Sequence, residues 1–161
     1  MKSIIKRILK EEIDNSVTKR IGGNDKIHIS HDDNLKFKNI PSNEQPISFK
    51  PKGMWFSFGT EWIDFIGSKK TMEDYVYDIN INDSKILTLG KENESQFLSK
   101  YGVKGDDGKM DVNWSKVASE WSGFEIIINP RELNNLWLWS TWDINSGCVW
   151  NIDGINSVRK L

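Results

Sequence analysis

The sequence contains few of the residues that cross-link a small protein or bind a metal in it. It has one cysteine, Cys148, and two histidines, His28 and His31, in 161 residues. A single cysteine forms no internal disulfide and supplies no cysteine-rich zinc site, so we expect no metal centre and a reducing environment. No hydrophobic run approaches the ~18 residues that a membrane span needs, and the N-terminal segment shows no small-residue cleavage site. These absences predict a cytoplasmic protein that does not enter a membrane.

An excess of one charge is missing as well. Lysine and arginine number 22 against 23 aspartate and glutamate, for a net charge of -1. This balance argues against an overall basic field for nucleic acid. Tryptophan, by contrast, is abundant, with eight residues, so aromatic side chains carry much of the burial. The length predicts a single domain over residues 1–161.

Hydrophobic periodicity predicts short strands separated by brief helices. Apolar residues at helical spacing indicate a helix over residues 2–19, which packs on the domain or, alternatively, lies on a membrane surface. Alternating or aromatic runs indicate strands at 26–30, 53–58, 75–81, 85–89 and 124–128, and helical spacing indicates short helices at 61–66, 93–101 and 113–120. The pattern predicts an α+β fold in which two small antiparallel sheets pack around a cleft, with the N-terminal helix outside.

Several motifs with known chemistry are absent. The chain has no glycine-rich dinucleotide or phosphate loop, no G-x-S-x-G nucleophile elbow and no H-E-x-x-H zinc motif. The segment 105–108 looks like part of a calcium loop but lacks the alternating oxygen ligands and the closing glutamate, so we interpret it as a surface turn.

Three segments together carry a resemblance to a known family. The first is His28-Ile29-Ser30, the second is Lys52-Gly53-Met54-Trp55-Phe56-Ser57, and the third runs from Asp143 through Gly147-Cys148 to Asp153. They resemble the H-Y-E branch of the ADP-ribosyltransferase superfamily, which includes the diphtheria-toxin and PARP-like enzymes. The third segment is also similar to small phage-encoded ADP-ribosyltransferases that block host defence, and the arrangement resembles uncharacterised phage proteins. The resemblance covers roughly residues 26–153.

The resemblance implies an ADP-ribosyltransferase-like fold around an NAD cleft and a mono-ADP-ribosyltransferase that uses NAD+ as substrate. The acceptor would be a host protein or nucleic acid, and the protein would be a toxin-like phage or bacterial effector that acts in the host cytoplasm. Asp143 would stabilise positive charge on the ribose. Trp55 would stack on nicotinamide, where the family usually has tyrosine, and His28 and Ser30 would hold ribose hydroxyls. Gly53 would permit close backbone approach, and Ser57 would support the site.

The residues leave alternatives open. Glu125 on the 124–128 strand is the competing catalytic carboxylate. His28 and Trp55 could be ordinary structural residues of a sheet, and Asp143 could cap a turn. A non-enzymatic module that binds protein or carbohydrate through tryptophan-rich surfaces is the alternative function. A degenerate transferase fold that inhibits a host protein by contact is a third.

Overall fold

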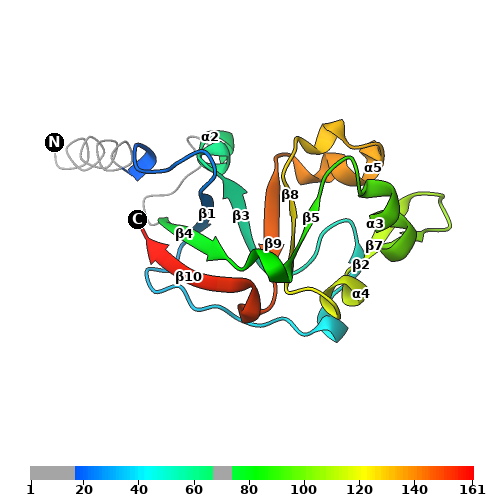
Figure 1. Cartoon of the computed structure of the whole chain (residues 1–161), viewed down its shortest axis with the longest axis horizontal. Helices are drawn as coiled ribbons and strands as arrows, with labels where there is room; N and C mark the ends of the chain where they lie inside the picture. The colour runs from blue at the N-terminus through cyan, green and yellow to red at the C-terminus, as the bar shows by residue number, and fades with distance from the viewer. Residues whose placement is uncertain (1–16, 67–73) are drawn as a thin grey trace.

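Strands dominate the part of the chain that the computed structural model describes, which is residues 17–66 and 74–161. A seven-stranded sheet has the order β10, β4, β1, β3, β9, β8, β5 (Figure 1). In that order the strands span Ile155–Lys160, Tyr75–Ile81, Lys26–Ser30, Met54–Phe58, Ser146–Val149, Gly123–Ile126 and Ile86–Leu89. A second sheet has the order β2 (Ile47–Ser48), β7 (Met110–Asn113), β6 (Gly102–Lys104).

The helices are short and lie mainly around the smaller sheet (Figure 1). They are α2 (Glu61–Ile66), α3 (Glu94–Tyr101), α4 (Trp114–Ala118) and α5 (Leu136–Trp139), with 3-10 turns η1 (Ser42–Glu44), η3 (Asp83–Lys85), η4 (Pro130–Glu132), η5 (Ser140–Trp142) and η6 (Ile152–Gly154). The expected α+β class, with mostly strands and few helices in two sheets, is confirmed. The expected small size of both sheets is wrong for one of them, which has seven strands and includes a parallel pair, β5 with β8.

Alternation along the strands gives the large sheet two distinct faces. Ile27 pairs with Ser57, and Ser57 pairs with Ser146, so these side chains share one face. Trp55 is two residues from Ser57 and lies on that same face. His28 is displaced by one residue from Ile27 and therefore lies on the opposite face. The register of β1 and β3 thus separates two side chains that the sequence places on neighbouring strands.

The main core lies between the Trp55 face and the smaller sheet with its helices. Four of the eight tryptophans are buried there, and each indole N–H has a partner inside the protein. Trp114, Trp139, Trp142 and Trp150 donate to the Ser48 carbonyl, the Glu94 carboxylate, the Phe49 carbonyl and the Trp121 carbonyl, respectively. Burial of these rings stabilises the fold, while the satisfied N–H groups avoid a desolvation cost.

Most predicted elements are found close to their expected positions. β1, β3, β4, β5, α2, α3 and α4 each lie within one or two residues of the predicted ends. The helix α3 ends at Tyr101 as expected, and Gly102 begins β6. The strand β8 begins at Gly123 and ends at Ile126, short of the predicted end at residue 128.

Five strands lie in segments for which the periodicity predicted none. β2, β6, β7 and β9 are two to four residues long, too short for alternation to be visible, and β10 is a largely exposed polar strand. The predicted helix over residues 2–19 lies outside the described residues except at its end, where Val17 and Thr18 are helical. None of the helices in the described part of the chain has the length and apolar character needed to cross a bilayer.

Candidate functional site

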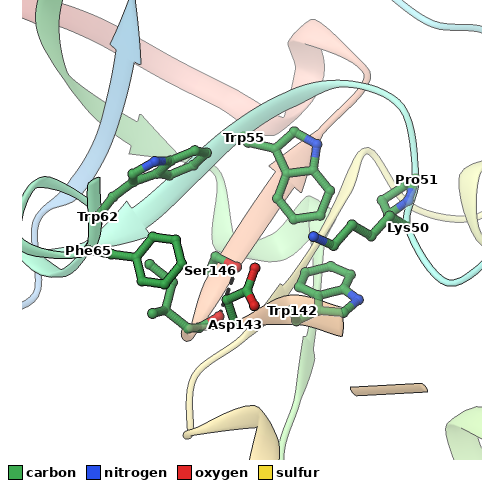
Figure 2. Close-up of a pocket in the computed structure, with 9 residues that line it drawn as sticks. Lys50, Pro51, Trp55, Trp62, Phe65, Trp142, Asp143 and Ser146 are labelled. Carbon is green, nitrogen blue, oxygen red and sulfur yellow. Dashed lines mark hydrogen bonds between the residues drawn. The ribbon is translucent and has the colours of Figure 1, made fainter. Parts of the chain in front are cut away.

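An open pocket of about 360 Å³ lies on the Trp55 face of the large sheet, where β3, α2 and the turn before β9 meet (Figure 2). Four aromatic side chains, one carboxylate and one ammonium dominate its wall. Its lining residues are Lys50, Pro51, Trp55, Trp62, Phe65, Trp142, Asp143, Ile144 and Ser146. We call this the Asp143 pocket.

The aromatic wall is held by the core beneath it. The rings of Trp55 and Trp142 lie 4.8 Å apart between centroids and are tilted by 58°. Trp142 is buried and donates its N–H to the Phe49 carbonyl at 2.9 Å, so its ring is fixed in position. Trp55 is half-buried and faces the pocket from β3. On the other side Trp62 is half-buried and Phe65 is 61% exposed, both on α2. The pocket therefore offers ring faces to a flat ligand.

Asp143 has an unusual backbone conformation. Its φ is 38° and its ψ is -54°, and it has the only positive φ of any described residue other than glycine. The Ile144 N–H donates to the Trp142 carbonyl across it, which makes Asp143 the centre of a γ-turn of the rare, strained kind. Such strain costs of order 1–3 kcal/mol and tends to cluster at functional sites.

The Asp143 carboxylate is exposed and makes no hydrogen bond or ion pair with any described residue. Its turn is nevertheless anchored by the residues that follow it. The Ser146 hydroxyl donates to the Ile144 carbonyl at 3.1 Å, and the side-chain amide of Asn145 donates to the Glu61 carboxylate on α2 when its nitrogen faces that group. The turn thus presents a free carboxylate from a fixed position.

His28 and Ser30 line a second pocket, of about 280 Å³, on the opposite face of the sheet. We call this the His28 pocket, and its wall also includes Lys36, Lys38 and Gly53. The Nδ1 atom of His28 lies 2.6 Å from the main-chain carbonyl oxygen of Trp55. Because a carbonyl only accepts, Nδ1 carries the hydrogen. Burial lowers the pKa of His28 below its ordinary value, and the bond to the Trp55 carbonyl opposes this only in part. The ring is therefore neutral, and its Nε2 is left as an acceptor.

The two pockets adjoin the place where β1 and β3 separate. Pairing of β1 with β3 includes Lys26 and Ile27, whereas pairing of β1 with β4 continues to Ser30. The edge of β1 from His28 to Ser30 that faces β3 therefore has no strand partner among the described residues. Backbone groups at such an edge are available to bind a ligand amide.

Gly53 lies directly before β3 and Ser57 lies within it, where the strand packs closely against the rest of the fold. A Cβ atom at Gly53 would lie 2.5 Å from the Val149 carbonyl oxygen and 2.8 Å from the Cys148 sulfur, so only glycine allows β3 to approach β9 this closely. Ser57 is fully buried, and its hydroxyl has no hydrogen-bond partner among the described residues. Ser57 lines neither pocket.

Glu125 lies away from both pockets. It is buried on the His28 face, accepts a hydrogen bond from the Thr88 hydroxyl at 3.0 Å and pairs with the Lys26 ammonium at 3.3 Å. Strands β3 and β9 lie between it and His28, a separation of three strand spacings or roughly 14 Å. Asp143, by contrast, shares its pocket with Trp55. Of the two candidate carboxylates, Asp143 is the one that a ligand can reach.

The structure thus brings the predicted site residues together in two groups. Trp55 and Asp143 share the Asp143 pocket, and His28, Ser30 and Gly53 share the His28 pocket. Four further residues that line the Asp143 pocket were not predicted from the sequence, namely Lys50, Trp62, Phe65 and Trp142. Their order along the chain gives no sign that they converge, although Trp142 directly precedes Asp143 and Lys50 lies two residues before the Trp55 motif.

No group of three or more potential metal ligands occurs among residues 17–66 and 74–161. Comparison with known proteins adds no constraint, because no family model, curated protein or solved structure matches the chain. The chemistry of the site is therefore interpreted from its own residues.

Proposed function

We propose that the protein is a mono-ADP-ribosyltransferase that transfers ADP-ribose from NAD+ to a host protein or nucleic acid. The observation that carries this proposal is the Asp143 pocket, which combines aromatic faces with an unpaired carboxylate on a strained turn. A pocket of this composition suits a flat cationic ring attached to a sugar that becomes positively charged. The pyridinium ring and the adjoining ribose of NAD+ have those properties.

In this reaction the bond between the ribose C1′ atom and the pyridinium nitrogen breaks. The nicotinamide leaves with the bonding electron pair and becomes neutral, while positive charge develops on the ribose. The Asp143 carboxylate stabilises that charge, and it accepts the proton of the acceptor group that attacks C1′. Trp55 holds the nicotinamide ring by stacking.

The His28 pocket would hold the rest of the dinucleotide. The neutral His28 ring offers Nε2 as an acceptor for a ribose hydroxyl, and Lys36 and Lys38 supply charge for the phosphates. The Ser30 hydroxyl already accepts from the Asp32 N–H at 3.0 Å and retains its own hydrogen for donation. The unpaired edge of β1 offers backbone groups to the carboxamide of nicotinamide.

The separation of His28 from Trp55 and Asp143 on opposite faces of the sheet favours the alternative of a binding module without catalysis. The tryptophans themselves give that alternative little support. Trp114, Trp139, Trp142 and Trp150 are core residues, and Trp137 is the tryptophan that stands out as an exposed side chain in the described residues. A degenerate transferase fold has the same architecture as an active one, so activity alone distinguishes the two.

The direct test is transfer of label from NAD+ to macromolecules of a bacterial lysate. Wild-type protein is expected to label an acceptor or at least to release nicotinamide, and Asp143→Asn is expected to lose both. Nuclease and protease treatment of the labelled product would show whether the acceptor is nucleic acid or protein. Absence of both label and nicotinamide release in wild-type samples that bind NAD+ would favour the inhibitory, degenerate fold.

A further inference from the structure

Lys50 occupies the Asp143 pocket with its charged end. Its Nζ atom lies 5.6 Å from the centroid of the Trp55 ring, a cation–π distance. Figure 2 shows the side chain reaching between the rings of Trp55 and Trp142, with its nitrogen on the side of Asp143. The ammonium is thus in the region where the proposed function puts the pyridinium ring.

The wall around this position favours positive charge. Trp55, Trp62, Phe65 and Trp142 present aromatic rings, and Asp143 adds a carboxylate. Aromatic faces carry negative electrostatic potential, and several rings with one acid form the type of enclosure that binds quaternary or delocalised cations. Lys50 is the single cationic side chain among the lining residues.

The side chain of Lys50 can leave while its backbone stays in place. The chain before it is held by the Trp142 N–H on the Phe49 carbonyl, and the chain after it is held by Gln45, which bonds the N–H and carbonyl of Lys52 at 2.9 and 2.7 Å. The Lys50 ammonium itself makes no hydrogen bond or ion pair with any described residue, and its contact in the pocket is with the Trp55 ring. Rotation about its side-chain torsions alone would empty the position.

We propose that Lys50 is an internal occupant of the cation position in the Asp143 pocket and that ligands with a delocalised positive charge bind there by displacing its ammonium. A cationic ring regains the attraction that the ammonium gives up, whereas a neutral ring does not. This inference rests on the proposed function for its ligand, since it assigns the pocket to the oxidised, charged form of the nicotinamide ring. It also gives a route for product release, because nicotinamide is neutral once the glycosidic bond has broken and Lys50 then returns.

The test uses two small probes that carry no phosphate or ribose. One is nicotinamide, which is neutral, and the other is nicotinamide methylated on its ring nitrogen, which is a cation of nearly the same shape. Binding is followed by quenching of tryptophan fluorescence in the wild type, Lys50→Ala, Lys50→Arg and Lys52→Ala. Lys52 is the matched control because it is exposed, two residues away and lines neither pocket.

We expect the wild type to bind the cation more tightly than neutral nicotinamide. Lys50→Ala is expected to strengthen binding of the cation by roughly threefold to tenfold, the range of one cation–π contact. Lys50→Arg keeps a competing cation and should stay near or below the wild-type affinity, and Lys52→Ala should match the wild type. Equal wild-type affinity for both probes, or unchanged or weaker cation binding in Lys50→Ala, would overturn the proposal.

Failure of the proposal for Lys50 can be distinguished from failure of the proposed transferase function. If the cation probe shows the expected pattern but NAD+ is neither cleaved nor transferred, the pocket is a cation site and the transferase proposal fails. If NAD+ is cleaved in an Asp143-dependent reaction but Lys50→Ala leaves cation binding unchanged, the role of Lys50 fails alone.

Discussion

Two carboxylates lie beside tryptophans of one segment, residues 134–143, and their surroundings differ sharply. Glu94 is 2% exposed and accepts four hydrogen bonds, from the Asn134 N–H and side-chain amide, the Asn135 N–H and the Trp139 indole. Asp143 is exposed, has no bonding partner among the described residues and sits on a strained turn beside Trp142. The hydrogen-bonding capacity of the Glu94 carboxylate is used within the fold, whereas the Asp143 carboxylate remains available to a ligand.

The largest effect on stability is expected when the Glu94 carboxylate is removed. Glu94→Ala would leave two backbone N–H groups and the Trp139 indole without their acceptor, and should lower the free energy of unfolding by about 3–5 kcal/mol. Urea denaturation measures this loss, with Asp143→Ala as the matched carboxylate deletion. If Asp143→Ala proved as destabilising as Glu94→Ala, the contrast between the two carboxylates would be wrong.

A smaller effect is expected on ligand binding in the Asp143 pocket. Trp55→Ala removes the proposed stacking surface and should weaken NAD+ binding by about 1–3 kcal/mol, or roughly fivefold to 150-fold in Kd. Calorimetry measures the change. Trp137→Ala, which removes a tryptophan that is 56% exposed and lines neither pocket, should leave the affinity unchanged. Equal affinities for wild type and Trp55→Ala would place NAD+ elsewhere.

The strain at Asp143 should be measurable as stability. Glycine adopts positive φ without the steric cost that Asp143 or alanine incurs there. Asp143→Gly should therefore be more stable than Asp143→Ala by about 1 kcal/mol, although both lack the carboxylate. Denaturation of the two variants under identical conditions tests this, and equal stability would show that the turn is unstrained in solution.

The smallest effect concerns His28 and pH. Burial lowers its pKa below the ordinary 6.5, so as the pH falls below that value the unfolded chain binds a proton at His28 before the folded protein does. The stability that this group contributes is present above the unfolded-state pKa and is lost as the pH falls toward the folded-state pKa. Unfolding at about pH 7.5 and about pH 5.5 should show a larger acid loss for wild type than for His28→Gln. An identical loss in both proteins would mean that His28 is already protonated or exposed.

Sequence patterns predicted the parts of the fold that depend on local periodicity. The strand β4 alternates over seven residues, and its ends were predicted to the residue. The short strands β6 and β7 form a hairpin with too few residues for alternation, and their pairing depends on contacts across the smaller sheet. Local patterns therefore gave the class of the fold but not the size of its sheets.

The candidate site was only partly predictable for a similar reason. Motifs placed Trp55 and Asp143 in one site, and the structure brings them into one pocket. The sequence could not show that β3 and β1 present Trp55 and His28 on opposite faces, because register is a property of strand pairing. Nor could it show that Glu125 is paired with Lys26, since the two residues lie on strands far apart in the chain.

In the proposed reaction Asp143, and not Glu125, is the carboxylate that acts on NAD+. The most direct measurement is the rate of nicotinamide release from NAD+ by Asp143→Asn and Glu125→Gln, alongside NAD+ affinity and circular dichroism of each sample. We predict that Asp143→Asn loses roughly 10²–10³ in rate with little change in affinity, because its charge acts mainly in the transition state. Glu125→Gln should retain turnover within a few fold. Wild-type turnover in Asp143→Asn together with its loss in a folded Glu125→Gln would contradict the assignment.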